Sequence, residues 1–446
     1  MGSKMPLIVE VISKETIKPS SPTPLHLRTF KLSRIDQYAF PVYVPLVLFY
    51  STNKGSNKGE YDVKEDKRLD HLKKSLSEIL THFYILGGRI DGNQFIDCND
   101  EGVNFFEARV NGKVSEMLNH PIPEELNKLL PKENNLYGLG PKVLLSIQVN
   151  IFNCGGMAVG VLIAHKAADA SSLGLFLNQW AAITRKEDSE ILPSELDLAS
   201  LFPPNKDELQ FTPSNGSSTK KVATKRFVFN ASNIAALKAK SSNNLYVKHP
   251  TRVEAVSALI WRCAMNVLKM RPEFVNSVSV AIHTVNLRGR MVPPLSNLFF
   301  GNVMTYAMTT LKIESPPELH CLVNQFRKAL RKIDGDHARK LQVDHYGHFA
   351  LGNYFKGATE KFVRRELVPF FFTSWCRFPF YEADFGWEKP IWISTVNLVT
   401  QNLITLMDTK CGIGIEAWVA LDEEDMDRFE CEPDIIAFTT ASGGAY

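Results

Sequence analysis

The chain of 446 residues is too long for a single hydrophobic core, so we expect two domains of about 200 residues each. Its 44% hydrophobic and 22% charged residues are an ordinary globular balance, and a net charge of +3 excludes the basic surface that nucleic-acid binding needs. The seven cysteines are odd in number, widely spaced and without a C-x-x-C pair, which argues against a disulfide framework and against a zinc site.

The N-terminal segment lacks the apolar stretch of a signal peptide. No run of residues approaches the roughly 18 apolar residues of a membrane-spanning helix. We therefore expect a cytoplasmic protein that has no membrane partner and whose cysteines are reduced.

Residues 1–192 are predicted to form an N-terminal domain that mixes strands and helices. The apolar run 42–50 predicts a buried strand, and the apolar spacing within 66–83 predicts an amphipathic helix. Residues 144–153 and 157–164 predict two strands joined by a glycine turn, and an amphipathic helix is expected to follow the second strand.

Residues 193–224 are rich in proline, glycine and serine, which predicts a crossover linker, and 225–446 would form the second domain. Thr251 and Glu254 have the spacing of a capping box, which predicts the start of a helix. The irregular order of strands and helices favours a mixed α/β fold over a doubly wound parallel sheet. The other elements expected in this half are strands at 225–230, 278–285, 303–313, 391–396, 403–407 and 414–421 and helices at 319–333 and near 423.

His165 and Asp169 form an H-x-x-x-D sequence between an apolar strand and a helix. Of the eleven histidines, His165 alone has an aspartate four residues later. An imidazole near its ordinary pKa of about 6.5 takes up a proton at neutral pH, and a carboxylate one turn later can hold the shape of the loop. A core or loop histidine paired with an aspartate has the same spacing, so spacing alone leaves both interpretations open.

Two further segments carry polar groups that chemistry can use. Thr373 and Trp375 offer a hydroxyl and an indole N–H that would stabilise a developing oxyanion, although a strand with a buried tryptophan has the same pattern. Asp384, Gly386 and Trp387 lie in the sequence Asp384-Phe-Gly-Trp-Glu388, which by itself predicts a tight turn with an aromatic side chain.

In their order and spacing, H-x-x-x-D, Asn286-Leu-Arg288, Phe300-Gly-Asn302 and Asp384-Phe-Gly-Trp387 resemble the plant BAHD family of acyl-CoA-dependent acyltransferases. The pairing of Leu32-Ser33 with Asp36 is similar as well, and the resemblance covers nearly the whole chain. It implies an α/β fold like that of chloramphenicol acetyltransferase. Two similar-sized domains, each a mixed sheet flanked by helices, would have a channel between them, and a segment of about 384–409 would return to the first domain's sheet.

The resemblance also implies roles for these residues. His165 would act as general base in a direct transfer from acyl-CoA, which is a co-substrate and leaves no need for a bound cofactor or a metal. Thr373 and Trp375 match proposed oxyanion donors, and Asp169 matches a structural aspartate that fixes the loop. Residues 384–387 match a structural motif away from the chemistry.

Coenzyme A phosphates prefer helix N-termini and basic side chains, which makes Thr251, Arg252, Arg288 and Arg290 the candidate contacts. Roles in capping and domain packing fit these four residues equally well, and Arg288 is also a candidate partner of Asp169.

The sequence at 9–19 and 408–418 resembles the alkaloid-acylating branch of the family, which implies a monomer that acetylates a hydroxyl of an alkaloid. A sugar, a terpenoid or a simple alcohol is an alternative acceptor, and a non-catalytic paralogue is an alternative to an enzyme. A condensation domain with an H-H-x-x-x-D core is disfavoured because Ala164 precedes His165.

The second motif departs from the family at Glu388, where glycine is usual. A glycine there would serve a backbone with positive φ, which glutamate adopts only with strain. Because residues 384–387 are intact, we expect Glu388 to be a solvated side chain that needs no such backbone.

Overall fold

The computed structural model describes residues 6–51, 67–119, 121–132, 142–186, 196–205, 221–343, 360–362, 364–398 and 400–440. The chain divides into two compact units. Unit 1 comprises Met1–Phe211, Ser296–Val303 and Phe378–Val396, and unit 2 comprises Thr212–Leu295, Met304–Arg377 and Asn397–Tyr446. Most of the predicted linker 193–224 lies outside the described residues.

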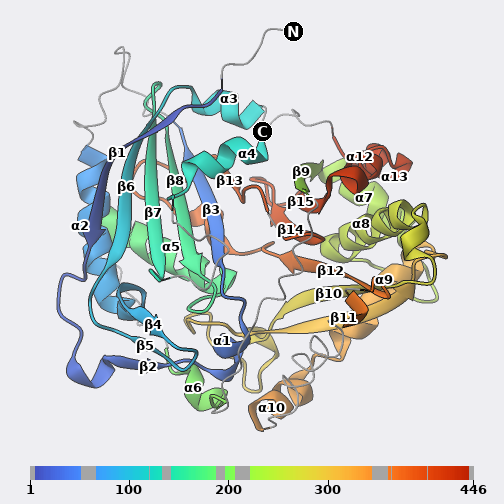
Figure 1. Cartoon of the computed structure of the whole chain (residues 1–446), viewed down its shortest axis with the longest axis horizontal. Coiled ribbons are helices and arrows are strands. Elements are labelled where there is room, and N and C mark those ends of the chain that lie inside the picture. Colours follow the sequence, from blue (N-terminus) through green and yellow to red (C-terminus); the bar gives the residue numbers. More distant parts are fainter. Residues whose placement is uncertain are drawn as a thin grey trace. The chain divides into compact units, whose positions relative to one another are not determined.

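Unit 1 contains a six-stranded mixed sheet in the order β1-β6-β7-β8-β3-β13 (Figure 1). Only β6 and β7 pair in parallel; the other neighbours are antiparallel. Every residue of β7, β8 and β3 is buried, which agrees with uninterrupted apolar runs in strands covered on both faces. The strands are β1 (Val9–Ile17), β6 (Val103–Val110), β7 (Leu145–Phe152), β8 (Met157–Ala164), β3 (Tyr43–Tyr50) and β13 (Trp392–Ser394).

Helices α2 (Lys67–His82) and α5 (Ala170–Arg185) cover one face of this sheet (Figure 1). They are joined by a hydrogen bond from Trp180 Nε1 to Ser75 Oγ at 3.0 Å. Against β8 lies the short helix η4 (Asn127–Leu129), so close that a Cβ on Gly160 would be 2.1 Å from the Leu129 carbonyl oxygen. Unit 1 also contains the small sheet β2 (Thr29–Lys31), β5 (Phe95–Asp97) and β4 (Arg89–Asp91), and the helices α1 (Arg34–Tyr38), α3 (Val114–Asn119), α4 (Pro123–Leu126) and α6 (Leu198–Leu201).

Unit 2 contains a second six-stranded mixed sheet in the order β11-β10-β12-β14-β15-β9. Strand β12 is parallel to both β10 and β14, and the other pairs are antiparallel. The strands are β11 (Met304–Lys312), β10 (Val278–Asn286), β12 (Leu367–Ser374), β14 (Leu403–Asp408), β15 (Ile415–Asp422) and β9 (Val222–Phe229).

The core of unit 2 is built around helix α8 (Arg252–Lys269), whose Trp261 donates a hydrogen bond from Nε1 to Ser279 Oγ of β10 at 2.8 Å. The capping box predicted at Thr251 and Glu254 is confirmed, with both reciprocal hydrogen bonds formed. Unit 2 also contains the helices α7 (Ala231–Lys240), α9 (Leu319–Arg331), α10 (Gly335–Val343), α12 (Glu423–Phe429) and α13 (Pro433–Phe438). None of the helices in the described parts of the chain is long and apolar enough to cross a membrane.

The mixed α/β fold class with two sheet-containing domains is confirmed, and the predicted strands and helices lie within a few residues of the observed ones. The returning segment is shorter than the expected 384–409. Strand β13 pairs with β3 in unit 1, but β14 pairs with β12 and β15 in unit 2. The return therefore ends at Val396, because the backbone of β14 is committed on both sides to the second sheet.

Candidate functional site

His165 is the first residue after β8, and its backbone N–H donates to the Val42 carbonyl at 2.9 Å. The chain then turns tightly, with the N–H groups of Ala167 and Ala168 both donating to the Ala164 carbonyl. His165 therefore sits on a rigid corner between a buried strand and helix α5, with its side chain partly exposed.

Asp169 is the N-cap of α5, and one carboxylate oxygen accepts from the Ser172 N–H at 2.8 Å. The other oxygen accepts from the Val303 N–H at 3.1 Å. Ser172 adds two hydrogen bonds to the backbone of Gly301, at 2.8 and 3.0 Å. These contacts tie the loop after His165 to the segment Ser296–Val303, which folds with unit 1 although it is distant in sequence.

Asn302, in that same segment, contacts His165 through both ends of its side chain. Its Nδ2 donates to the His165 carbonyl at 2.7 Å and to Asp36 Oδ1 at 2.9 Å. Since both partners are pure acceptors, the amide orientation is fixed, and Oδ1 is the atom that lies 3.0 Å from His165 Nδ1. A carbonyl oxygen accepts only, so Nδ1 carries the hydrogen of the neutral ring and Nε2 keeps the basic lone pair.

Asp36 lies behind Asn302 and is almost completely buried, with 1% of its surface exposed. Its carboxylate accepts from Ser33 N and Oγ at 2.9 and 2.6 Å, and from Asn302 N and Nδ2, both at 2.9 Å. Burial raises the pKa of Asp36, and the hydrogen bonds from Ser33 and Asn302 oppose that shift in part.

Lys166 is the neighbour of His165 and is also buried. Its Nζ donates to the Gln37 carbonyl at 2.6 Å and to Asn93 Oδ1 at 2.7 Å. Burial lowers the pKa of Lys166 to about 8, and the charge of Asp36 acts in the opposite direction. The loop that holds His165 is thus anchored to α1 by an ammonium group.

Asn302 and Asp36 stood in the segments that carry the family resemblance, but sequence reasoning gave neither of them a part in the site, and it missed Lys166 entirely. The three residues are separated by more than a hundred positions from one another, and only the fold brings them together. The usable signal was the presence of Asp36 and Asn302 in the segments that resemble the family.

Thr373 and Trp375, the predicted oxyanion donors, belong to unit 2, where Thr373 is in β12 and Trp375 follows its end. The Trp375 N–H donates to the Leu406 carbonyl at 2.8 Å, which extends the pairing with β14. The Trp375 side chain is buried and that of Thr373 is partly exposed.

Asp384, Gly386 and Trp387 form a tight turn in unit 1, in which the Gly386 N–H donates to Asp384 Oδ1 at 2.8 Å. Trp387 stacks on Phe385, and both rings contact Tyr50 at the end of β3. Tyr50 pairs with the first residue of β8, whereas His165 follows the last. Seven residue steps along a strand separate the two places by about 23 Å.

The expectation for Glu388 is wrong in one respect. Its side chain is exposed, as expected, but its backbone has φ of 82°, in the left-handed region that favours glycine. The turn needs positive φ at two positions, because Gly386 has φ of 101°. Although residues 384–387 are intact, the turn still requires positive φ at Glu388, and the backbone of Glu388 is strained.

Two of the candidate coenzyme A contacts have structural partners inside unit 2. The Thr251 hydroxyl caps α8. Arg252 donates to the carbonyls of Gly412, Ile413 and Gly414 at 2.6, 2.8 and 3.2 Å, and it forms an ion pair with Asp408 at 3.0 Å. Its guanidinium thereby fixes the turn between β14 and β15.

The other two candidates are also engaged. Arg290 donates to the carbonyls of Leu330 and Ile333 at 2.9 and 2.5 Å, at the C-terminal end of α9, which satisfies helix carbonyls that lack an internal partner. Arg288 is 1% exposed, and its Nη1 lies 3.4 Å from Asn286 Oδ1. Structural roles thus account for the described contacts of Thr251, Arg252 and Arg290.

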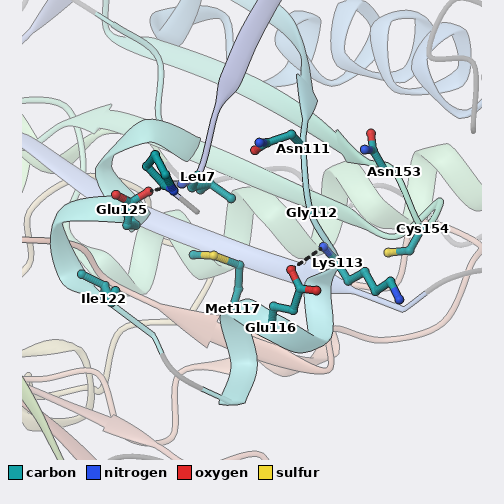
Figure 2. A pocket seen from close by; sticks show the side chains of 11 residues that line it. Leu7, Asn111, Gly112, Lys113, Glu116, Met117, Ile122, Glu125, Asn153 and Cys154 are labelled. Atoms are coloured by element: carbon teal, nitrogen blue, oxygen red, sulfur yellow. Dashed lines mark hydrogen bonds between the residues drawn. The ribbon is translucent and has the colours of Figure 1, made fainter. Parts of the chain in front are cut away.

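A cavity of about 890 Å³ opens in unit 1 at the other end of the sheet. Figure 2 shows Lys113 and Glu116 on one side of it and Cys154, in the turn between β7 and β8, on another. Since Cys154 precedes β8 and His165 follows it, the length of that strand, more than about 23 Å, separates the cavity from the imidazole. No group of three or more His, Cys, Asp or Glu side chains placed to hold a metal occurs among the residues that the structure describes.

A sequence model described as "Transferase family" matches residues 7–435. Over 474 residues the chain is 37% identical to (13S,14R)-1,13-dihydroxy-N-methylcanadine 13-O-acetyltransferase AT1 of Papaver somniferum, covering 96% of this chain and 98% of the relative. It is 38% identical over 438 residues to a limonoid 21-O-acetyltransferase of Melia azedarach, covering 97% and 98%.

Among solved structures, the crystal structure of vinorine synthase, an enzyme of Rauvolfia serpentina, superimposes with a TM-score of 0.81 at 36% identity. The superposition covers 97% of this chain and 98% of that one.

Proposed function

Because the chain belongs to the BAHD family of acyl-CoA-dependent O-acyltransferases, we propose that it moves an acyl group, acetyl above all, from acyl-CoA to a hydroxyl of a plant specialised metabolite. His165 is the general base of this reaction, and the transfer is direct. The enzyme is a cytoplasmic monomer, and it acts on small molecules.

The observation that carries this proposal is the contact between His165 Nδ1 and Asn302 Oδ1 at 3.0 Å. It places the hydrogen of the neutral ring on Nδ1 and leaves the lone pair of Nε2 free to take a proton, as a general base requires. Asp169 supports the role indirectly, because its carboxylate holds the loop through the N–H groups of Ser172 and Val303.

The reaction then proceeds in one addition and one elimination. Nε2 takes the proton of the acceptor hydroxyl while its oxygen attacks the thioester carbonyl, and a tetrahedral oxyanion forms. The C–S bond breaks, the ester is released, and the imidazolium returns its proton to the thiolate of coenzyme A. General-base assistance of this kind contributes about 10²–10⁴-fold to the rate.

Thr373 and Trp375 are proposed as the donors that stabilise the oxyanion. For the phosphates of coenzyme A, the contacts described above weaken the case for Thr251, Arg252 and Arg290, whose polar groups already serve unit 2. Arg288 stays a proposed contact, because a guanidinium group is suited to phosphate.

We propose an alkaloid alcohol as the acceptor, since the relative acting on a canadine derivative matches the chain over nearly its whole length. A terpenoid alcohol is the second candidate, because the limonoid enzyme is as similar, at 38% against 37% identity. Acceptor pockets are lined by scattered residues, so a difference of this size does not separate the two classes.

An acceptor panel tests the proposal. Purified protein with acetyl-CoA is offered isoquinoline and indole alkaloid alcohols, limonoid alcohols, sugars and simple alcohols, and the esters are detected by mass spectrometry. We expect acetyl esters of an alkaloid alcohol to form with the highest kcat/KM. Limonoid esters alone would transfer the assignment to the second candidate. No ester from any acceptor, with acetyl-CoA and longer acyl-CoA thioesters alike, would contradict the transferase proposal.

A further inference from the structure

The polar network behind His165 contains a buried anion that the proposed reaction does not use directly. Four hydrogen bonds reach the Asp36 carboxylate, two from Ser33 and two from Asn302. Three come from N–H groups, which only donate. The fourth comes from Ser33 Oγ, which already accepts from the Asp36 N–H and so directs its own hydrogen to the carboxylate. This donor set is suited to an ionised carboxylate.

Asn302 connects that anion to the imidazole. One end of its amide donates to Asp36 Oδ1 at 2.9 Å, and the other end lies 3.0 Å from His165 Nδ1. An anion at the N–H end polarises the amide and makes its carbonyl oxygen a stronger acceptor, since hydrogen bonds in a buried chain strengthen one another. The imidazolium that forms when Nε2 takes a proton would gain most from that stronger acceptor.

We propose that Asp36 is a positioning residue for the acyl transfer, which holds His165 in its Nδ1–H tautomer and favours the imidazolium by acting through the side-chain amide of Asn302. The inference rests on the proposed function and adds a source of charge to it. The Asp36 carboxylate does not contact the imidazole itself, because the side chain of Asn302 lies between the two groups.

The other charged groups of these elements define the electrostatic setting. Arg34 shares α1 with Asp36, Lys166 and Asp169 lie on the loop with His165, and the segment Ser296–Val303 has no charged side chain. Lys166 balances the charge of Asp36, which makes the buried anion tolerable. Removal of the Asp36 charge would leave that ammonium without its balancing anion.

Two variants of one capping box separate this role from a purely structural one. Asp36→Asn keeps the size of the side chain and removes its charge. Ser33→Ala removes the capping hydroxyl and one hydrogen bond to the same carboxylate but keeps the charge. Both variants weaken the cap of α1, so a loss of stability is expected in each, and the pH profile is the readout that separates the charge from the cap.

The measurement is kcat with saturating acetyl-CoA and acceptor between pH 5.5 and 9. For Asp36→Asn we expect kcat to fall about tenfold or more and the apparent pKa of the base to decrease by about 1 unit, with KM for acetyl-CoA changed less than twofold. For Ser33→Ala we expect kcat within about threefold of the wild type, an unmoved pKa and a lower thermal midpoint. Equal pH profiles for wild type and folded Asp36→Asn would overturn the proposal, and so would equal pKa shifts in the two variants.

A spectroscopic measurement on the wild type covers the case in which Asp36→Asn does not fold. With 15N-labelled histidine and the His165 signals assigned by their loss in His165→Gln, the neutral ring is expected to carry its hydrogen on Nδ1. A ring protonated on Nε2 contradicts the role proposed for Asp36, because Asn302 would then have no hydrogen to accept.

A double variant tests transmission through the amide of Asn302. In an Asn302→Ala background, Asp36→Asn is expected to change the pKa of His165 by less than half of its effect alone. A full effect there would refute transmission through the amide.

Failure of the role proposed for Asp36 and failure of the proposed function give different results. If the wild type forms no ester with any acceptor, the transferase proposal fails first. If the wild type is active, His165→Ala is inactive and Asp36→Asn matches the wild type in kcat and pKa, only the role of Asp36 is refuted.

Discussion

Glu388 adopts a backbone φ of 82°, which for a residue with a Cβ costs roughly 1 kcal/mol or more. The side chain is exposed, so nothing in its packing requires a glutamate. The strain lies at the end of the turn that packs on Tyr50, about 23 Å along the sheet from His165. The strain is therefore expected to lower the stability of the protein and to leave the rate of the reaction at His165 unchanged.

The change Glu388→Gly is expected to stabilise the protein by about 0.5 kcal/mol, because the strain is relieved and glycine's larger unfolded-state entropy removes part of the gain. The measurement is the thermal midpoint at neutral pH, with Glu388→Ala as the matched control that keeps a Cβ and therefore the strain. A glycine variant no more stable than the alanine variant would show that the turn is unstrained.

Asn302 illustrates how a side chain can set the tautomer of a neighbouring histidine without touching a substrate. Asn302 uses both amide hydrogens on fixed acceptors, and only for that reason does its oxygen determine the tautomer of His165. The sequence identified Asn302 as part of a motif. It did not reveal the hydrogen-bond directions, because they depend on an approach between residues 137 positions apart.

At the scale of elements, strand β8 positions His165, and its path depends on close contact with η4. Gln148 and Asn150 of β7 donate to the carbonyls of Lys128 and Leu129, which holds η4 against the sheet. Gly160 of β8 leaves no room for a Cβ at that contact. The apolar run 157–164 predicted the strand correctly, but the reason for Gly160 appears only when η4 is in place.

Gly160→Ala is expected to destabilise unit 1 by about 2–4 kcal/mol, because its Cβ would be 2.1 Å from a backbone oxygen that cannot rotate away. Gly112→Ala in the same unit is the control, since a Cβ there meets only side-chain atoms at 3.4 and 3.8 Å. Thermal unfolding followed by circular dichroism distinguishes the two variants. Similar midpoints for both would mean that β8 and η4 separate without cost.

For the whole molecule, the sequence predicted the fold class and most strands and helices. Periodicity and capping signals were sufficient for elements such as α8, whose capping box is local. The division of the chain into its two units could not be predicted in full from the sequence. The segments 296–303 and 378–396 join unit 1 through contacts such as Val303 with Asp169 and β13 with β3, and no local pattern encodes such pairings.

His283 makes the stability of the whole chain dependent on pH. It lies in β10, stacked on Phe372 at 4.7 Å and edge-on to Phe326 at 4.6 Å, and burial lowers its pKa to about 4. The unfolded chain binds a proton at this histidine near pH 6.5 and the folded chain does not. The stability that neutral His283 contributes is therefore fully present above about pH 6.5, and up to about 3 kcal/mol of it is lost as pH falls toward 4.

The change His283→Phe should remove that decline. We expect the thermal midpoint of the variant to fall less than that of the wild type between pH 7 and pH 5. The exposed His71, substituted by Phe in a second variant, controls for the loss of a histidine as such. Identical pH dependence in the wild type and His283→Phe would show that His283 does not control acid stability.

The central claim is that His165 takes the proton of the acceptor alcohol, and release of the coenzyme A thiol from acetyl-CoA in the presence of an accepted alcohol measures it most directly. His165→Ala and the nearly isosteric His165→Gln, each verified as folded by its thermal midpoint, are compared with the wild type. We predict that both lower kcat by about 10²–10⁴-fold while the KM for acetyl-CoA changes little. Acceptor-dependent thiol release at the wild-type rate in either variant would contradict the assignment of His165 as the base.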